Sequence, residues 1–451
     1  MENIEKMIFV SETKIPQIIE YTSDLETILE KINSYDIISS EDFLIIINLL
    51  KINIKKSSNK ILKRAKSRLE LVRNKRNYIN LDKKEGYISA LVSELFRDPN
   101  ISKNSNDLWL IEIQRKVLEN LHKENFELSI NWGQAKRSCG KLKTDSYYSD
   151  FSELYAIASL QTLIEAISII LGKNVVITIR SGGERFSQAL FTDKEKLAEY
   201  DKQRQILADL VSSNNKIIIK PYTVDKDICS RKLVSIANEI PHSVINNNFH
   251  TILLNIDWEN IIKNKISPHD INIPNSIFYL VEKGWGIDDI IVMAIFAIFR
   301  PDSSSFWVRK LPVGIDFDEI INFFYLVASE STKKYIAIHL IGYRKINKIV
   351  DDKGYLRITV HAKRNCSDIP AIYLLNKESR NKLPQHNCTL LDNNEIYFLS
   401  KIEMTLSREK YKAIYIDDVR MNWFSKENTP LMYVRKDNDS YLKMLANIDF
   451  F

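Results

Sequence analysis

The sequence is poor in the residues that interrupt or cross-link regular structure. Its 451 residues include 11 glycines, 11 prolines and only 4 cysteines. These cysteines lie far apart and form no C-x-x-C pair, so a disulfide framework is not expected in a chain of this size. The chain also contains no internal repeat and no low-complexity linker. With 45% hydrophobic and 27% charged residues it is typical of a folded globular protein, and its length indicates about two or three domains.

Long apolar runs are missing as well. The longest uninterrupted one, residues 290–299, has ten residues, whereas a membrane-spanning helix needs about twenty. The first residues, MENIEKMIFVSETK, place acidic residues before the apolar ones and contain no secretory signal. We therefore expect a cytoplasmic protein with no membrane partner.

Basic residues are concentrated in one stretch. Residues 51–78 contain eleven Lys or Arg and one acid, although the whole chain carries a formal net charge of only +6. Within this stretch Ile61, Ala65, Leu69 and Val72 recur at helical spacing, which is typical of an amphipathic helix with a solvated basic face. A polyanion could bind along the same face, but no interleaved aromatic residues or known binding motif accompany the charge. Nucleic acid is therefore not the expected partner.

Hydrophobic periodicity divides the chain into three regions. Residues 1–125 have mainly helical spacing, and the pattern changes near Phe126. Residues 126–392 are expected to form a Rossmann-like domain. Residues 393–451 are expected to form a mostly β, antiparallel addition, because EIYFLSKIEMTL, KAIYIDD and LMYVRKD are strand-like runs. The predicted fold class is α/β, with an N-terminal helical region and a C-terminal β-rich addition.

The central region alternates strands and helices. FELSINW and VVITI are predicted strands, and between them Asp150 and Glu153 have the spacing of a capping box that starts a helix ending at Gly172. A helix, DKEKLAEYDKQRQILADLV, and a strand, KIIIKPY, follow. This order predicts a parallel sheet, whose ligands bind beyond the carboxyl ends of the strands.

The segment after VVITI stands at that end of the predicted sheet. RSGG is expected to make a sharp turn that brings Arg180, Ser181, Gly182, Gly183 and Arg185 to a ligand. Paired glycines also fit a plain strand-ending turn, since they adopt positive φ at little cost.

Two further segments carry candidate site residues. Lys136 and Lys143 belong to a basic loop, GQAKRSCGKLKT, before the helix N-terminus, where a phosphate or carboxylate could be held. Further along, YLRITVH and AIYLLN are predicted strands, and alternation places Arg357 and His361 on one face of the first. His361 is then available for proton transfer near neutral pH, although a buried structural histidine fits the same pattern.

Metal and cofactor motifs are not present in recognisable form. His361, Cys366, His386 and Cys388 have a spacing that matches no standard zinc site. The sequence contains no Gly-x-Gly-x-x-Gly, Walker or Gly-x-Ser-x-Gly motif. Neither a metal nor another cofactor is expected.

Four blocks in order resemble the isocyanide synthase family, the pyoverdine/dityrosine biosynthesis proteins. GQAKRSCGKLKTDSYYSDFSELYAIASL is similar to the family's lysine-containing loop and the following helix, with Asp150 and Glu153 at the matching acidic positions. VVITIRSGGERFS resembles its strand and Ser-Asp-Gly turn, YLRITVHAK its Arg-x-Ser-x-His strand, and LPQHNCTLL its closing Pro-Trp-His block. The resemblance spans about residues 125–392.

The chain departs from the family pattern at three positions. Gly182 stands in place of the turn aspartate, Thr359 in place of the strand serine and Gln385 in place of the tryptophan beside the final histidine. Loss of the turn aspartate removes one acid that the family offers there, so a different amino acid substrate or altered activity is compatible with the resemblance.

The resemblance implies an isonitrile synthase. Such an enzyme converts the amino group of an amino acid, here Tyr or Trp by expectation, to an isonitrile with ribulose 5-phosphate as carbon donor, without a metal or redox cofactor. The implied catalytic residues are His361, His386 and Lys136. The implied substrate-binding residues are Lys143, Arg180, Ser181, Gly182, Gly183, Arg185 and Arg357.

Two other interpretations remain open from the sequence. One is a basic helical adaptor that binds nucleic acid through residues 51–78. The other is an enzyme acting on another phosphorylated sugar or a nucleotide, because cation-rich loops do not identify the molecule that carries the phosphate. The sequence also leaves open whether the chain forms a homo-oligomer.

Overall fold

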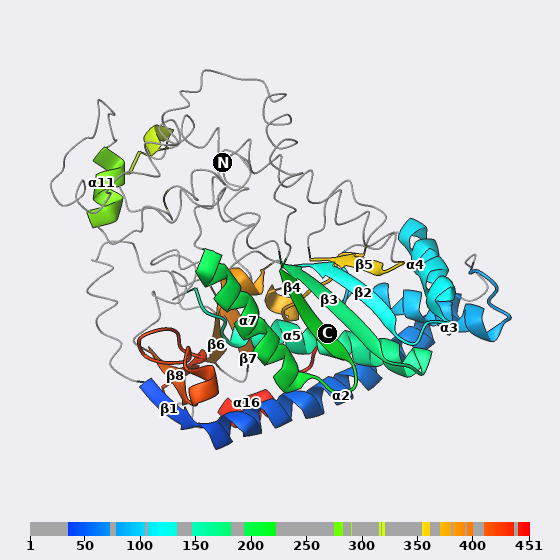
Figure 1. Ribbon diagram of the computed structural model, residues 1–451, viewed down its shortest axis with the longest axis horizontal. Coiled ribbons are helices and arrows are strands. Elements are labelled where there is room, and N and C mark those ends of the chain that lie inside the picture. The colour runs from blue at the N-terminus through cyan, green and yellow to red at the C-terminus, as the bar shows by residue number, and fades with distance from the viewer. Residues whose placement is uncertain are drawn as a thin grey trace.

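A computed structural model shows an α/β protein built around a parallel sheet and a long central helix (Figure 1). The sheet contains β2 (Phe126–Asn131), β3 (Val175–Ser181), β4 (Lys216–Pro221) and β5 (Leu356–Thr359), in the order β4-β3-β2-β5 with every pair parallel. The structure describes residues 35–72, 78–103, 107–132, 147–181, 194–221, 275–282, 290, 315–316, 318–320, 354–360, 370–379, 382–392, 395–399, 410–436 and 441–451.

Helix α5 (Phe151–Leu171) is the centre of the core. Asp150 and Glu153 form the predicted capping box at its start, and Gly172 ends it in the left-handed conformation, with φ of 65°. Every residue of α5 from Phe151 to Ile164 is buried, rather than one stripe as in a surface helix, and only the last turns reach the surface. Its length and hydropathy would also suit a membrane span, but 72% of the most apolar window is buried inside the protein, as in a core helix.

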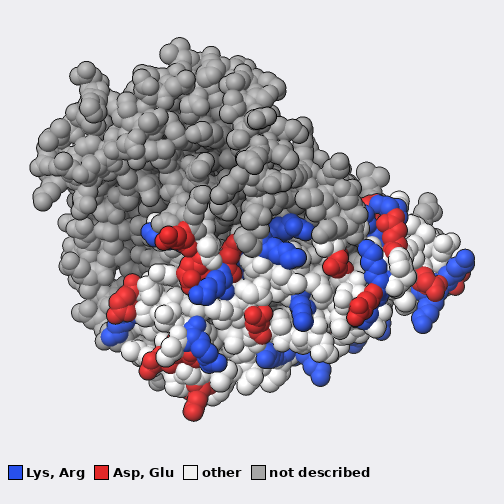
Figure 2. Space-filling view, viewed as in Figure 1, with Lys and Arg blue, Asp and Glu red and all other residues white. Residues whose placement is uncertain are grey.

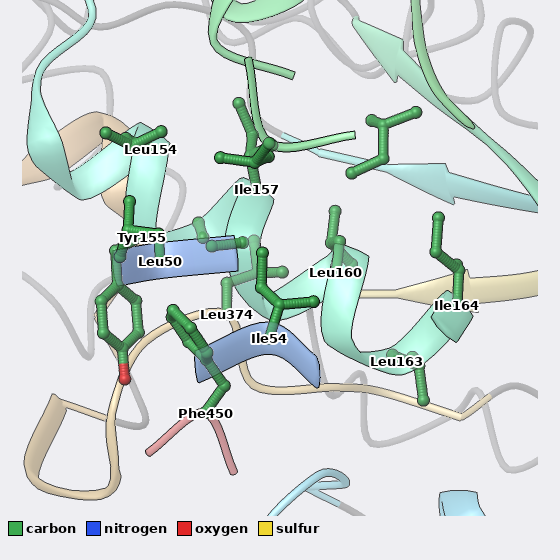
Figure 3. Packing of buried hydrophobic residues seen from close by; sticks show 14 of the residues in the cluster. Leu50, Ile54, Leu154, Tyr155, Ile157, Leu160, Leu163, Ile164, Leu374 and Phe450 are labelled. Carbon is green, nitrogen blue, oxygen red and sulfur yellow. The ribbon is translucent and has the colours of Figure 1, made fainter. Parts of the chain in front are cut away.

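The N-terminal region packs directly on α5. It contains α2 (Ser40–Val72), α3 (Lys84–Phe96) and α4 (Asp107–Asn120), and α2 runs along α5 with the C-terminal helix α16 (Tyr441–Ala446) beside it (Figure 1). Figure 3 shows Leu50 and Ile54 of α2 against α5, with Phe450 beside Tyr155. The Tyr155 and Phe450 ring centroids are 5.0 Å apart. The amphipathic helix predicted for residues 51–78 is confirmed through Val72, with Ile61, Ala65 and Leu69 buried.

A second sheet combines residues 35–39 with strands of the C-terminal region. It has the order β1-β8-β9-β6-β7. Within the predicted C-terminal addition β8 and β9 pair antiparallel, as expected, whereas β1 and β6, which lie outside that addition, pair with β8 and β9 in parallel. The sequence analysis missed β1 (Tyr35–Ser39), which pairs with β8 in a region predicted to be helical. The other strands are β6 (Cys388–Asp392), β7 (Glu395–Leu399), β8 (Tyr411–Asp417) and β9 (Met432–Arg435).

Short elements and connections complete the described chain. Helix α7 (Lys194–Val211) confirms the predicted second helix and packs on β4 and α5. The segment AIYLLN, predicted as a strand, makes only isolated bridges at Ala371 and Ile372. The remaining elements are helix α11 (Asn275–Glu282) and the 3₁₀ turns η2 (Lys377–Ser379), η3 (Pro384–His386) and η5 (Val419–Met421).

The predicted fold class is therefore confirmed: a parallel α/β core carries helices before it and strands after it. One continuous cluster of buried apolar side chains includes residues from Ile38 to Phe450 and thus draws on all three predicted regions. The domain boundaries at residues 125 and 392 stay predictions.

Candidate active site at the carboxyl ends of the parallel strands

Three strands of the parallel sheet end at the same level. In the register, Asn131 of β2 lies opposite Arg180 of β3 and Thr359 of β5. The segments that follow these strands in the sequence therefore leave the sheet from one edge, the edge at which ligands of parallel sheets bind. They carry the predicted lysine loop, the double-glycine segment and His361.

Arg180 lies on the face of the sheet opposite to α5. Its Nε donates a hydrogen bond of 3.0 Å to Oγ of Ser129 on β2, and its guanidinium lies 5.9 Å from the centroid of the Tyr355 ring. Burial raises the pKa of Tyr355, and the neighbouring Glu127 raises it further. Arg180 is thus held in place at the edge of the sheet by a hydroxyl and an aromatic ring.

Arg357 shares this outer face. It lies opposite Ser129 in the register, so the two arginines Arg180 and Arg357 flank the same serine from neighbouring strands. The predicted alternation of β5 is confirmed, because Leu356 and Ile358 are buried while Arg357 is only partly covered. Two cations therefore lie on one face of the sheet, on the strands to either side of Ser129.

Ser181 belongs to the other face. The prediction that the turn begins at Arg180 is wrong, since both Arg180 and Ser181 are residues of β3. Successive strand residues point to opposite sides, and Ser181 is fully buried on the side of α5. Sequence reasoning extended the turn too far because it ended the strand with the apolar run.

The closing block of the resemblance lies next to the same edge. Nε1 of the buried Trp132, the first residue after β2, donates a hydrogen bond of 3.0 Å to Oε1 of Gln385 in η3. Oγ of Ser152, in the first turn of α5, donates to the carbonyl of Asn387 at 2.9 Å. These bonds hold the backbone of η3, which includes His386, beside β2 and the start of α5.

The N-terminus of α5 is closed to an anion. The N–H of Phe151 donates to the carbonyl of Leu431, and the N–H groups of Ser152 and Glu153 are taken by the Asp150 side chain. The N–H of Leu154 donates to the carbonyl of Asp150. Backbone N–H groups at this helix end are therefore not open to a phosphate or carboxylate, although the sequence analysis considered an anion here.

The structure adds a cluster that sequence reasoning missed. On α7, Arg204 lies against two aromatic rings, with its guanidinium 5.3 Å from the Trp132 ring centroid and 4.6 Å from that of Tyr200, also on α7. The Tyr200 hydroxyl donates to Oε1 of Glu153 at 3.0 Å. Burial, and then the charge of Glu153, raises the pKa of Tyr200 well above its usual value. The polar spacing of α7 gave no signal that Arg204 is buried.

Lys103 is a second residue that the sequence analysis did not single out. Its Nζ donates to the carbonyl of Val360 at 2.8 Å, one residue before His361. Burial lowers the pKa of Lys103 to about 8. An amine with this pKa exchanges its proton near neutral pH, close to the end of β5.

The remaining predicted site residues lie outside the described residues. They are Lys136, Lys143, Gly182, Gly183, Arg185 and His361, and for His386 only the backbone is described. Within the described ranges, no group of three or more His, Cys, Asp or Glu side chains could hold a metal ion. Cys388 is buried, and within the described residues it forms no disulfide.

The basic stretch is partly neutralised within the protein. Lys60 pairs with Asp449, Arg64 pairs with Asp98 at 2.6 Å, and Arg68 lies 3.3 Å from Asp98. On the face shown in Figure 2, basic and acidic residues of the described part are interspersed rather than separated into regions of one sign. These pairs reduce the charge that α2 offers to a polyanion.

The fold and the edge described above define an α/β protein with a polar site at the carboxyl ends of a parallel sheet. No protein-family model and no curated protein matches the chain. Among solved structures, it is similar to the PvcA protein from Pseudomonas aeruginosa, with 12% sequence identity and a TM-score of 0.41. The likeness covers 71% of this chain and 91% of PvcA.

Proposed function

We propose that the protein is a cytoplasmic isonitrile synthase. It joins the amino group of an amino acid, Tyr or Trp by expectation, to a carbon of ribulose 5-phosphate. The amine condenses with the sugar ketone to an imine with loss of water, and proton transfers with carbon–carbon cleavage then discard the sugar remainder and its phosphate. This chemistry requires anchors for a carboxylate and a phosphate, and groups that relay protons.

The observation that carries the proposal is the common edge of the parallel sheet. The strand register places the end of β2, after which the first block begins, beside the strands of the second and third blocks. The bond between Trp132 and Gln385 holds the fourth block beside the end of β2. The blocks are separated by up to about two hundred residues in the sequence, and a shared active site gives a reason for their proximity.

The described residues suit part of the chemistry. Arg180 and Arg357 supply two cations on one face, and planar guanidinium groups bind carboxylate and phosphate well. Lys103 supplies an amine that releases its proton near pH 8, beside the strand that leads to His361. The roles of His361 and His386 as proton carriers, and of Lys136 as a catalytic residue that could anchor an anion, remain proposals from the resemblance.

The proposal is tested by direct product detection. Purified full-length protein is incubated with ribulose 5-phosphate and each of the twenty amino acids, and isonitrile is trapped with tetrazine and measured by mass spectrometry. We expect a trapped product with Tyr or Trp. If no amino acid yields a product, the proposed function is wrong.

A single substitution tests the proton carrier. His361→Ala is expected to fold normally and to lose at least about a hundredfold in turnover, since a positioned acid or base contributes that much. Circular dichroism of the variant confirms folding, and the trapped product reports turnover. A variant with full rate would show that His361 is not the proton carrier.

A further inference from the structure

Arg204 is a fully buried cation with open hydrogen-bond donors. Its side chain has 0% exposure, and Asp201 is its ion-pair partner among the described residues, through Nη2. Nε and Nη1 have no hydrogen-bond partner. Unmade hydrogen bonds of a buried charged group carry a large desolvation penalty, so proteins rarely leave two on one side chain. A missing acceptor is therefore the simplest explanation of these two donors.

The guanidinium is held in place by two aromatic rings that are themselves fixed. It lies over Trp132 and Tyr200, and stacking on a ring leaves the edges of the guanidinium plane available for hydrogen bonds. Trp132 is anchored through Nε1 to Gln385, and Tyr200 through its hydroxyl to Glu153. A cation fixed in this way is preorganised for a ligand, since little side-chain freedom remains to be lost on binding.

The negative charges nearby are already compensated. Asp150 accepts hydrogen bonds from the N–H groups of Ser152 and Glu153, and Glu153 accepts from the Asp150 N–H and from Tyr200. Both carboxylates also stand at the helix end whose dipole favours negative charge. They satisfy the N-terminus of α5. Among the described residues near this helix end, Arg204 is the charged group with unfilled donors, and the neutral Ser149 hydroxyl also has no partner.

We propose that Arg204, with Trp132 and Tyr200, forms a binding site for a substrate oxyanion, either a carboxylate or a phosphate. Nε and Nη1 lie on the two sides of Nη2, which Asp201 engages, so an oxyanion can take an N–H on either side. The site adjoins Trp132 at the end of β2, where the candidate active site lies. Because the side chain has no exposed surface, binding requires a local opening of the protein, and association is slower than diffusion. Which substrate carries the oxyanion depends on the proposed function, whereas the existence of the oxyanion site does not.

The first experiment tests the oxyanion site without assuming the function. The thermal unfolding temperature of the full-length protein is measured with inorganic phosphate, acetate or chloride at equal ionic strength. Phosphate or acetate is expected to raise this temperature above that in chloride. Arg204→Lys keeps the charge next to Asp201 but loses the planar donor fork, and should weaken the apparent affinity at least about tenfold. Arg64→Lys, the same change in a buried ion pair elsewhere, should bind like the wild type.

A second variant covers a failure of Arg204→Lys to fold. Arg204→Met combined with Asp201→Asn removes both charges of the pair together, so that no unpaired buried carboxylate remains. This double variant should also lose stabilisation by the oxyanion.

The second experiment identifies the oxyanion with ligand pairs that differ only in the charged group. Tyrosine is compared with tyramine, and ribulose 5-phosphate with ribulose, by calorimetric titration of the wild type and Arg204→Lys. If the variant no longer binds tyrosine more tightly than tyramine, the oxyanion is a carboxylate. If it no longer binds ribulose 5-phosphate more tightly than ribulose, the oxyanion is a phosphate.

The outcomes separate the two proposals. If inorganic phosphate or acetate stabilises the wild type through Arg204 but neither ligand pair binds, the oxyanion site stands and the proposed function fails. If the wild type gains no stability from either anion, or if both Arg204 variants respond as the wild type does, the oxyanion site is refuted.

Discussion

Two clusters of arginine and acid differ in how deeply their arginines are buried and in how many carboxylates surround them. Between α2 and α3, Arg64 and Arg68 contact Glu94 and Asp98, whose side chains are 1% exposed. Each arginine keeps 25% exposure, and Nε of Arg68 lies 3.7 Å from a carboxylate oxygen of Glu94. At α7, Arg204 has no exposure and a single carboxylate partner among the described residues.

The difference indicates that one cluster stabilises the fold and the other binds a ligand. In the α2–α3 cluster two arginines face two acids, and water still reaches both arginines, as in a structural network. Nε of Arg68 lacks a hydrogen-bond partner among the described residues, but one such nitrogen on a partly exposed side chain costs less than two on a fully buried one. In the Arg204 cluster the charge is dry, stacked and short of acceptors. Polar groups that the fold leaves unsatisfied concentrate at functional sites, and this one adjoins the carboxyl edge of the parallel sheet.

The largest expected effect lies in the structural cluster. Asp98→Ala removes the shared partner of Arg64 and Arg68 and should lower the free energy of unfolding by about 3–5 kcal/mol, the effect of breaking a buried pair. Urea unfolding followed by circular dichroism measures the change. Glu112→Ala, which breaks an exposed pair with Arg115, should cost at most about 1 kcal/mol. Equal effects of the two changes would contradict a structural role for the α2–α3 cluster.

Tyr200→Phe is expected to lower the free energy of unfolding by less than Asp98→Ala does, and its effect should depend on pH. It keeps the ring against Arg204 but removes the hydrogen bond to Glu153, at a cost of about 1–3 kcal/mol near pH 7. The pKa of Tyr200 is raised in the folded protein, so its hydroxyl binds its proton more tightly there than in the unfolded chain. The associated stability is fully present below pH 10 and is lost as pH rises above it.

The alkaline unfolding profile checks this prediction. Burial also raises the pKa of Tyr155. Between pH 10 and 11.5, Tyr200→Phe and Tyr155→Phe should each reduce the fall in unfolding free energy by up to about 1.4 kcal/mol per pH unit. Only Tyr200→Phe should also change stabilisation by phosphate or acetate. Unchanged slopes in both variants would show that neither hydroxyl has the protonation that we assign.

The last expected effect is a change in how stability depends on pH, at Lys103. Its pKa is lowered to about 8 in the folded protein, against an ordinary value of 10.5, so between these values the unfolded chain binds more protons. The unfolding free energy contributed by Lys103 therefore rises with pH across this window, and the cost of burying its charge is fully present below pH 8. Lys103→Met should remove this rise, which urea unfolding at pH 7.5, 9 and 10.5 would detect. A rise of equal size in the variant would assign it to other groups.

The sequence predicted the elements that follow from local chemistry. The capping box at Asp150, the left-handed Gly172 and the alternation of Leu356, Arg357 and Ile358 are each set by neighbouring residues. The parallel sheet followed from the order of these elements. Strand β1 was missed because it pairs with β8, more than three hundred residues away, and its sequence alone does not specify that partner.

The site was predictable only in part, for a similar reason. The order of the elements predicted that Arg180 lies near the carboxyl end of β3, and the alternation predicted that Arg357 lies on one face of β5; the strand register agrees with both. Arg204 was missed because helix α7 is polar in sequence, and its burial arises from contacts with Trp132 and Tyr200. The bond between Trp132 and Gln385 joins residues 253 positions apart, which no local pattern indicates.

Hydrogen–deuterium exchange with and without ligand tests most directly that the carboxyl edge of the parallel sheet is the functional site. The protein is labelled alone, and with tyrosine and ribulose 5-phosphate together. We predict that protection is concentrated in peptides covering residues 126–132, 175–181 and 194–211, with no change in residues 51–72 of α2. Protection confined to α2, or equal exchange in all of these peptides, would contradict the account.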